Sequence, residues 1–249
     1  MYVTVNGARL YFDVEGAGLV PDGKTMRERP TLLLLHGGPG FDHSGFKPGF
    51  STLADVAQIV YLDHRGNGRS EYGDPSNWNL AQWGDDVREF CDVLGIHKPI
   101  VYGVSFGGFV AQSYATRHPE HPGKLVLAST AARVQWNAVF DAFERIGGIE
   151  ARRIAQEYWL TPTPQRRIVY REKCHPLYNT RPPGDPDTSI RAIVHDPVNL
   201  HFARDEFTHM DFRAELKRIS CPTLVMAGEN DPITPIAFSE TIVASLPPD

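Results

Sequence analysis

A serine between two glycines stands where a strand pattern gives way to a helix pattern in this chain of 249 residues. Residues 100–102 are β-branched or aromatic and predict a short buried strand, while residues 106–117 have helical spacing. The stretch Gly103-Val104-Ser105-Phe106-Gly107 would turn sharply between them, because glycines leave room for such a turn. It would hold the Ser105 hydroxyl at a helix N-terminus, where backbone N–H groups stabilise developing negative charge. The pattern predicts a nucleophilic serine; the alternative is an inert serine in a glycine-rich turn.

Three more loops of unusual composition follow predicted strands. The apolar run 31–35 leads into His36-Gly-Gly-Pro-Gly40, whose small residues let the backbone approach a ligand closely. The buried strand predicted at 58–62 leads into the polar loop 63–70, and the buried strand predicted at 222–227 leads into the loop 228–235. Each loop therefore lies at the C-terminal end of a strand, which is the working edge of a parallel sheet.

The elements that must position these loops alternate between strand and helix. Apolar residues at helical spacing predict a helix over 79–94, with Gly95 as its stop, and a final helix over 236–246. A further strand is predicted at 124–128, and residues 2–14 predict a hairpin around Asn6-Gly7. Residues 15–30 are expected to form a polar loop. The alternation predicts an α/β fold with a doubly wound, mostly parallel sheet and an N-terminal hairpin.

The strand pattern stops between residues 129 and 212. Helical spacing recurs there over 134–147, 150–159 and 165–174, separated by proline-rich loops. About eighty residues without a strand inside an α/β chain predict a helical cap over the sheet. We therefore divide the chain into core residues 1–128, a cap at 129–212 and core residues 213–249, in which 213–219 is expected to be a short helix.

Composition excludes several classes of protein. The net charge is −5, with 41% hydrophobic and 22% charged residues, and basic residues do not cluster, so nucleic acid is not an expected partner. The first residues do not resemble a signal peptide, and the longest strongly apolar run, 32–35, is too short to span a membrane. Cys91, Cys174 and Cys221 are scattered and lack metal-ligand spacing. We expect a cytoplasmic protein without metal or cofactor.

The ordered set of motifs resembles the α/β-hydrolase family, and within it the group of proline iminopeptidases and related esterases. The set comprises His36-Gly-Gly-Pro-Gly, the loop 63–70, Gly-x-Ser105-x-Gly and Gly228-x-x-Asp231-x-x-x-Pro235. The resemblance implies that Ser105 is the nucleophile and that Asp231 orients a histidine. Glu229 is a nearby alternative for the acid, and the alternative role for Asp231 is that of a structural carboxylate in a turn. It implies an oxyanion hole made by the backbone N–H groups of Phe106 and Gly38, with Gly37 less suited.

The triad that the resemblance implies lacks its histidine. In this family the histidine follows the acid, whereas the last histidine here is His209. We therefore expect the catalytic histidine C-terminal to Asp249, on a segment with a last strand and a closing helix. The alternative is a relative that only binds ligands. The resemblance makes His36 structural, and His64 and Arg65 are expected to hold their loop. The other histidines are expected on surfaces or in the cap.

A serine nucleophile supports acyl transfer, so the expected substrate is a small ester, lactone or amide, or a short peptide. A proline iminopeptidase is the alternative activity. Phe106 departs from the tryptophan usual there, and Phe41 from a further glycine. An aminopeptidase also needs carboxylates for the substrate ammonium, but the helical spacing of the cap acids equally fits a solvated face. These acids are Asp141, Glu144, Glu150 and Glu157.

Aromatic residues of the cap have two interpretations. They could line an apolar substrate pocket, or they could form the core of the cap, which their helical spacing favours. The candidates for substrate contact are Trp136, Phe140 and Trp159, with Gly37 from the core.

Overall fold

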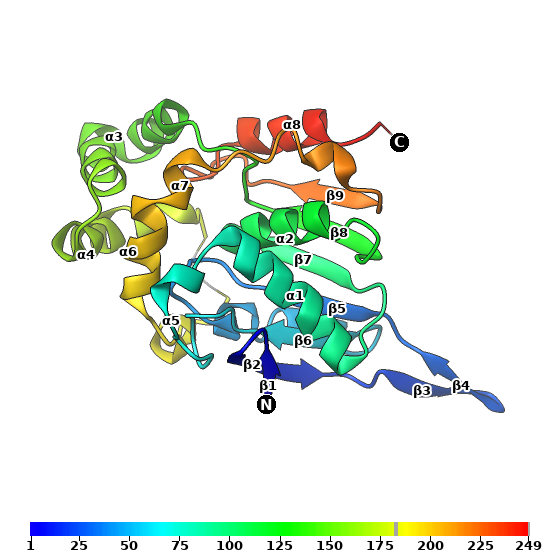
Figure 1. The fold of residues 1–249 in the computed structure, drawn as a ribbon. Helices are drawn as coiled ribbons and strands as arrows, with labels where there is room; N and C mark the ends of the chain where they lie inside the picture. The colour runs from blue at the N-terminus through cyan, green and yellow to red at the C-terminus, as the bar shows by residue number, and fades with distance from the viewer. Residues whose placement is uncertain (182–183, 249) are drawn as a thin grey trace.

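The computed structural model describes residues 1–181 and 184–248, and a sheet of seven strands forms its centre (Figure 1). The strand order is β1-β2-β6-β5-β7-β8-β9, in which β1 and β2 are antiparallel and β6 to β9 run parallel to β5. This is the predicted α/β-hydrolase fold. The strands of this sheet are β1 (Tyr2–Val5), β2 (Ala8–Glu15), β5 (Thr31–Leu35), β6 (Gln58–Leu62), β7 (Ile100–Val104), β8 (Lys124–Ala128) and β9 (Thr223–Met226).

Alternate residues of the central strands enter two separate cores. Leu33 and Leu35 of β5 join the larger core, on the face covered by α1 (Leu80–Leu94) and α2 (Phe106–Arg117). Leu32 and Leu34 face the other way, toward aromatic residues of the 3-10 helices η1 (His43–Phe46) and η2 (Phe50–Leu53). Both faces are therefore buried, which explains the unbroken apolar run of this strand.

Sequence signals set the ends of α1. The Asn79 side chain accepts a hydrogen bond from the Gln82 backbone N–H, and Gly95 adopts a left-handed conformation, with φ of 65°, after the last turn. The predicted helix over 79–94 is confirmed with these caps. Asn6 and Gly7 likewise have positive φ in the turn between β1 and β2, as the predicted hairpin requires.

The prediction of a loop at 15–30 was wrong. The chain there forms a second hairpin, β3 (Leu19–Asp22) and β4 (Thr25–Glu28), which projects away from the main sheet (Figure 1). Asp22 pairs with Thr25 across a turn of two residues, in which Gly23 has a φ of 62°. Nearly every residue of the ribbon is exposed, so the sequence carries no apolar alternation to reveal it.

The cap helices lie together at one end of the sheet (Figure 1). The longest, α3, holds two helical segments joined at Gly148, whose φ of 76° lies outside the helical range, in the gap between the two helices predicted there. Residues 129–212 contain the helices α3 (Trp136–Leu160), α4 (Pro164–Lys173), η4 (His175–Tyr178), α5 (Thr188–Arg191), α6 (Asp196–Arg204) and α7 (Glu206–His209).

Two expectations for the C-terminal part need correction. The helix expected at 213–219 is only one 3-10 turn, η5 (Leu216–Arg218). The strand β9 was expected to be buried, but it is the edge of the sheet, and the Leu224 and Met226 side chains are 56% and 48% exposed. Helix α8 (Ile236–Ser245) follows it, as predicted, and a short 3-10 helix, η3 (Pro75–Asn77), precedes α1.

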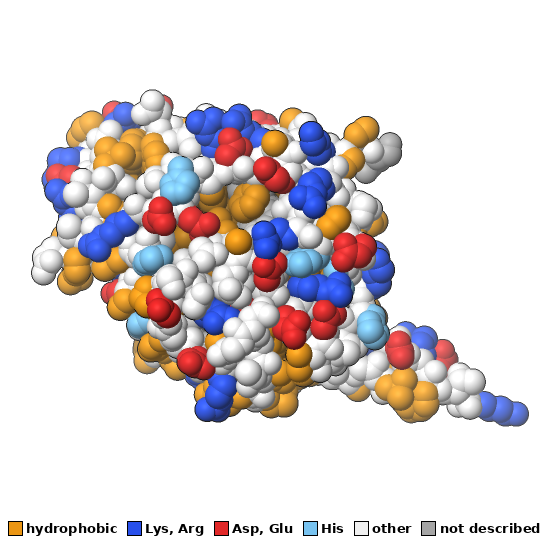
Figure 2. Space-filling model, viewed as in Figure 1, with side chains coloured by type: hydrophobic (Ala, Val, Ile, Leu, Met, Phe, Trp, Pro, Cys, Tyr) orange, Lys and Arg blue, Asp and Glu red, His pale blue; other side chains and the backbone are white. Residues whose placement is uncertain are grey.

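Charged side chains of both signs alternate over the face shown in Figure 2. Within residues 1–181 and 184–248, no helix has both the length and the apolar character needed to cross a membrane. The same described residues hold no cluster of histidine, cysteine or carboxylate side chains suited to a metal ion.

Candidate active site

Ser105 occupies the sharp turn between β7 and α2 in a conformation that is rare for a residue with a side chain. Its φ is 53° and its ψ is −117°. The turn is held by the Ser105 backbone N–H, which donates to the Ala128 carbonyl at 3.0 Å. The Ser105 carbonyl accepts from the Gly108 N–H at 2.9 Å and from the Thr130 hydroxyl at 2.9 Å. Strained backbone fixed by its surroundings is common at functional sites.

The two glycines of the motif allow the chain to pass itself at this turn. A Cβ atom added at Gly107 would lie 2.0 Å from the Leu35 carbonyl oxygen, and one at Gly103 would lie 2.4 Å from the Gly107 carbonyl oxygen. Both contacts are with backbone, which cannot move aside easily. The glycine spacing seen in the sequence is therefore a packing requirement of the turn that presents Ser105.

Backbone N–H groups next to Ser105 are available to a ligand. The Phe106 N–H begins α2, and neither it nor the Gly38 N–H donates to any acceptor among the described residues. Gly38 lines the same cavity as Ser105, whereas Gly37 lines a different one. This placement suits the predicted choice of Gly38 over Gly37 as an oxyanion donor.

Buried polar contacts fix the loop that carries Gly38. The Asn67 side chain accepts from the Gly40 N–H at 2.6 Å. Asp63, fully buried, accepts from both the backbone N–H and the Nδ1 atom of His43, at 2.9 and 2.7 Å, and from the Arg69 N–H at 2.9 Å. The loop 63–70 thus holds the glycine-rich loop in place.

His36, in the glycine-rich loop, and His64, in the loop 63–70, contact each other in neutral form. His36 Nε2 accepts from the His64 N–H at 3.2 Å, while its Nδ1 lies 2.8 Å from the Gly37 carbonyl, so the proton is on Nδ1. The His64 ring lies 4.5 Å from that of His36, tilted by 52°, and packs edge-on against Phe106. Burial lowers the pKa of His36, and lowers the pKa of His64 well below its ordinary value. The structural role predicted for His36 agrees with this geometry.

These lowered pKa values predict a loss of stability in mild acid. The unfolded chain binds protons at both histidines below about pH 6.5, whereas the folded chain binds them only at lower pH, so the free energy of unfolding falls as the pH falls through that value. Replacing His64 with Phe removes one of these sites. The decline between pH 6 and pH 5 should then be smaller by about 1 kcal/mol, measured by urea unfolding. The exposed His97, changed to Gln, should leave the decline unaltered; an equal decline in all three proteins would contradict the prediction.

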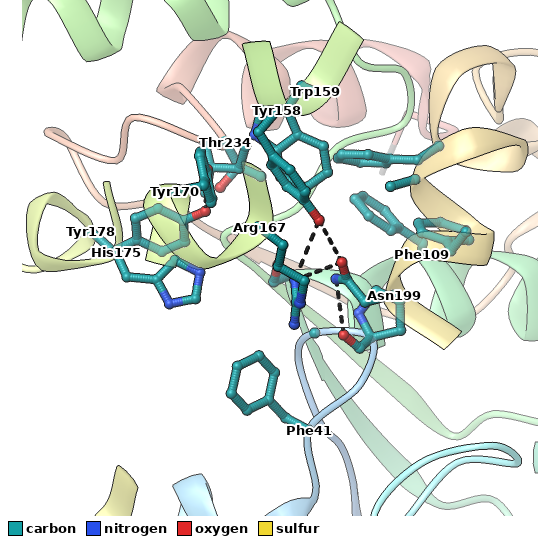
Figure 3. Close-up of a pocket in the computed structure, with 17 residues that line it drawn as sticks. Phe41, Phe109, Tyr158, Trp159, Arg167, Tyr170, His175, Tyr178, Asn199 and Thr234 are labelled. Atoms are coloured by element: carbon teal, nitrogen blue, oxygen red, sulfur yellow. Dashed lines mark hydrogen bonds between the residues drawn. The ribbon is translucent and has the colours of Figure 1, made fainter. Parts of the chain in front are cut away.

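A cavity of about 260 Å³ opens between Ser105 and the cap (Figure 3). Helices α3, α4 and α6 line one part of it, and the loop of Gly38 lines another. Its size suits a small ligand. The aromatic residues lining it are Phe41, Phe109, Tyr158, Trp159, Tyr170, His175, Tyr178, Phe202 and Phe207.

A second cavity, of about 520 Å³, joins Ser105 to Asp231. Asp231 lies in the turn after β9, where its carboxylate accepts from the Ile233 and Thr234 N–H groups at 2.9 and 2.8 Å and from the Thr234 hydroxyl at 2.8 Å. Glu229 lines the same cavity. Among the described residues, no histidine is hydrogen-bonded to Ser105 or Asp231, so the structure brings the predicted nucleophile and acid to one cavity without a base between them.

Of the three cap aromatics expected to contact substrate, the structure places one in the cavity wall and two in the core of the cap. Trp159 lines the cavity with Ser105. Trp136 and Phe140 stack on each other at 5.8 Å in the cap core and are not among the described lining residues. The sequence did not single out Arg167 or Asn199 as cavity residues, since helical spacing does not show which face of α4 or α6 meets the sheet.

The expectation that the remaining histidines lie on surfaces or in the cap was wrong for two of them. His43 is buried against Asp63, and His121 is buried and hydrogen-bonded to the Tyr114 hydroxyl. His175, in the cap, lines the cavity with Ser105, and burial lowers its pKa to about 4, with Arg167 and Arg171 adding to the effect. His175 is therefore neutral at neutral pH.

Comparison of the chain with known proteins identifies its family. A model described as the alpha/beta hydrolase fold matches residues 30–249, and the chain belongs to that family. The chain is 26% identical to the proline iminopeptidase PfmaB of Pestalotiopsis fici over 98% of its own length and 87% of the relative's. It is 29% identical to the putative carbamate hydrolase RutD of a Caulobacter species, over 98% and 85%. The esterase of Exiguobacterium antarcticum superimposes with a TM-score of 0.71 at 18% identity, over 98% and 87%. These similarities identify the protein as a hydrolase of the α/β fold.

Proposed function

We propose that the protein is a serine hydrolase that cleaves a small ester, lactone or amide through an acyl-enzyme on Ser105. The observation that carries the proposal is the position of Ser105: a strained turn, two backbone N–H groups beside it that no described residue accepts, and two cavities that it lines. The Ser105 Oγ would attack the carbonyl carbon, and the Gly38 and Phe106 N–H groups would stabilise the negative oxygen, each by roughly 3 kcal/mol. The alcohol or amine would leave with a proton, and water would then release the acid.

The proton of Ser105 requires a base in the cavity that Asp231 also lines. We propose that an imidazole group occupies this space, oriented by Asp231. The reaction needs such a group because a neutral hydroxyl is a weak nucleophile. Free imidazole has the same chemistry as the histidine side chain and can test this space directly.

The charge of the substrate cavity favours an ester or lactone over a peptide with a free amino group. None of the described residues lining the cavity with Ser105 is Asp or Glu, and Arg167 lines it. Nor do the cap acids reach it. Arg152 pairs with Asp141 and Glu144 at 2.5 and 2.9 Å, and Arg153 pairs with Glu150 and Glu157, all at the surface. An ammonium group would lack a counter-charge in this cavity, so the iminopeptidase activity remains the alternative.

The test is hydrolysis of 4-nitrophenyl acetate, a small lactone and proline 4-nitroanilide, each with and without imidazole. We expect turnover of the ester or lactone, and an acyl adduct on Ser105 detected by mass spectrometry. Imidazole should raise the rate to saturation, and Asp231→Asn should weaken that rise. Preference for the anilide would support the iminopeptidase instead. No turnover and no adduct in any condition would favour a protein that only binds ligands.

We also propose a reducing, cytoplasmic location. Cys91, Cys174 and Cys221 are all unpaired. Burial raises the pKa of Cys91 and the pKa of Cys174 to about 12, so both thiols stay protonated and unreactive. Fractionation of cells that express the protein would test the location.

A further inference from the structure

A buried arginine of the cap reaches the cavity that contains Ser105. The Arg167 side chain is 3% exposed, and α4 carries it toward α6 (Figure 3). Its Nε donates to Asp196 at 2.5 Å, and its Nη1 donates to the Asn199 side-chain oxygen at 2.6 Å and to the Tyr158 hydroxyl at 3.3 Å. Asn199 in turn donates to the Pro39 carbonyl at 3.1 Å, beside Gly38.

One nitrogen of this guanidinium has nothing to bond to. Nη2 of Arg167 is buried and has no hydrogen-bond partner among the described residues. A guanidinium has five N–H donors, and three are used by Asp196, Asn199 and Tyr158. The two donors of Nη2 remain. Leaving charged donors buried without an acceptor is unfavourable. A ligand in the cavity that accepts hydrogen bonds from Nη2 would remove this cost, and its binding would be stabilised accordingly.

The charges around Arg167 favour an anionic acceptor. Its counter-ion, Asp196, has a side chain that is 42% exposed, so the negative charge is partly in water while the positive charge is buried. No Asp or Glu is among the described residues lining the cavity. The neutral His175 adds no second positive charge at neutral pH. A single fixed cation thus faces a small, largely aromatic cavity.

We propose that the substrate of this hydrolase carries a carboxylate that accepts hydrogen bonds from Nη2 of Arg167, which makes Arg167 a specificity-determining residue. The inference rests on the proposed function, because it assigns the substrate of the same site. The guanidinium suits a carboxylate, since its planar donors match the oxygen geometry. The scissile bond would lie at Ser105 and the carboxylate on the cap side of the cavity. The substrate class is then a monoester of a short dicarboxylic acid, or a lactone of a short hydroxydicarboxylic acid that keeps one free carboxylate.

A purely structural arginine is the rival explanation. Arg167 does connect α4 to Asp196 and Asn199 of α6. Those contacts use Nε and Nη1 only, and they explain neither the unpaired Nη2 nor its position in the wall of the cavity. The two explanations predict different ligand binding. An anion site prefers a charged ligand to a neutral one of the same shape, whereas a purely structural arginine does not.

The first experiment measures binding without chemistry. Calorimetry compares glutarate with glutaramide, its neutral analogue of equal length; neither contains an ester. The wild-type protein should bind glutarate at least about tenfold more tightly, the ratio expected from one charge-assisted hydrogen bond. Arg167→Gln should lose this preference. Arg171→Gln should keep it, because Arg171 lies one turn further along α4, over the Phe41 ring, and does not line the cavity. Circular dichroism checks folding, and Arg167→Lys serves if the Gln variant does not fold; it should weaken the preference without abolishing it, because an ammonium keeps the charge but cannot present the paired donors of Nη2.

The second experiment measures turnover of mono-4-nitrophenyl glutarate and 4-nitrophenyl pentanoate, which differ only in the terminal carboxylate. We expect kcat/KM to favour the glutarate ester by about tenfold or more in the wild type, and not in Arg167→Gln. Equal binding of glutarate and glutaramide by the wild type would overturn the anion site, as would a preference that survives in Arg167→Gln. Binding preference without hydrolysis of either ester would overturn the proposed function alone, whereas equal hydrolysis without binding preference would overturn the anion site alone.

Discussion

With imidazole present as the base, replacing Ser105 with Ala is expected to reduce ester hydrolysis by about tenfold or more, to the rate that imidazole alone gives. The change removes only the hydroxyl that would attack the carbonyl, and leaves the Gly38 and Phe106 N–H groups in place. It should also abolish the acyl adduct and any stimulation by imidazole. The measurement is kcat/KM for 4-nitrophenyl acetate together with the intact mass after incubation with the ester.

A second serine in the same cavity provides the control for this variant. Ser129 follows β8 and lines the cavity between Ser105 and Asp231, but it is not part of the sharp turn. Ser129→Ala should stay within about threefold of the wild-type rate, because the Ser129 hydroxyl is not among the described hydrogen-bond partners of Ser105 or Asp231. Residual turnover in Ser105→Ala close to that of Ser129→Ala would show that the ester is cleaved elsewhere on the protein.

The features that the sequence predicted well are those set by local patterns. The run 31–35 is apolar throughout because both faces of β5 are buried, and the Gly103 and Gly107 spacing follows from two backbone contacts. Asn79 and Gly95 marked the ends of α1 because each satisfies the backbone at a helix terminus. Such signals lie within a few residues of the element that they specify.

The features that the sequence missed depend on distant contacts or on solvent. The β3–β4 ribbon touches water on most of its surface, so hydrophobic periodicity could not reveal it, although Asp22-Gly23 is a turn signal. Arg167 looked like one of several charged residues in a polar helix. Its burial arises only when α4 packs against Tyr158 of α3 and Asn199 of α6, which lie 9 and 32 residues away. The cavity wall is therefore a product of tertiary packing.

The second large effect is expected on stability, from a buried ion pair at the base of the site loop. Arg65, in the loop 63–70, donates to Asp86 of α1 through Nε and Nη2 at 2.7 and 2.8 Å, and both side chains are nearly fully buried. Asp86 also accepts from the Asn6 side chain at 3.0 Å, in the turn of the N-terminal hairpin. One carboxylate thus joins the hairpin, the helix and the loop that supports Gly38.

Asp86→Ala should lower the free energy of unfolding by about 3–5 kcal/mol, because it leaves the Arg65 guanidinium buried without its counter-ion. The neighbouring Asp85 provides a matched control. It pairs with Arg117 at the surface, where the two side chains are 35% and 44% exposed, so Asp85→Ala should cost about 1 kcal/mol or less. Urea unfolding followed by tryptophan fluorescence measures both. Since the loop 63–70 also holds the glycine-rich loop, Asp86→Ala should lower ester hydrolysis at temperatures where the variant is still folded. Equal costs for the two variants would mean that water reaches Arg65 and that burial does not decide the strength of this pair.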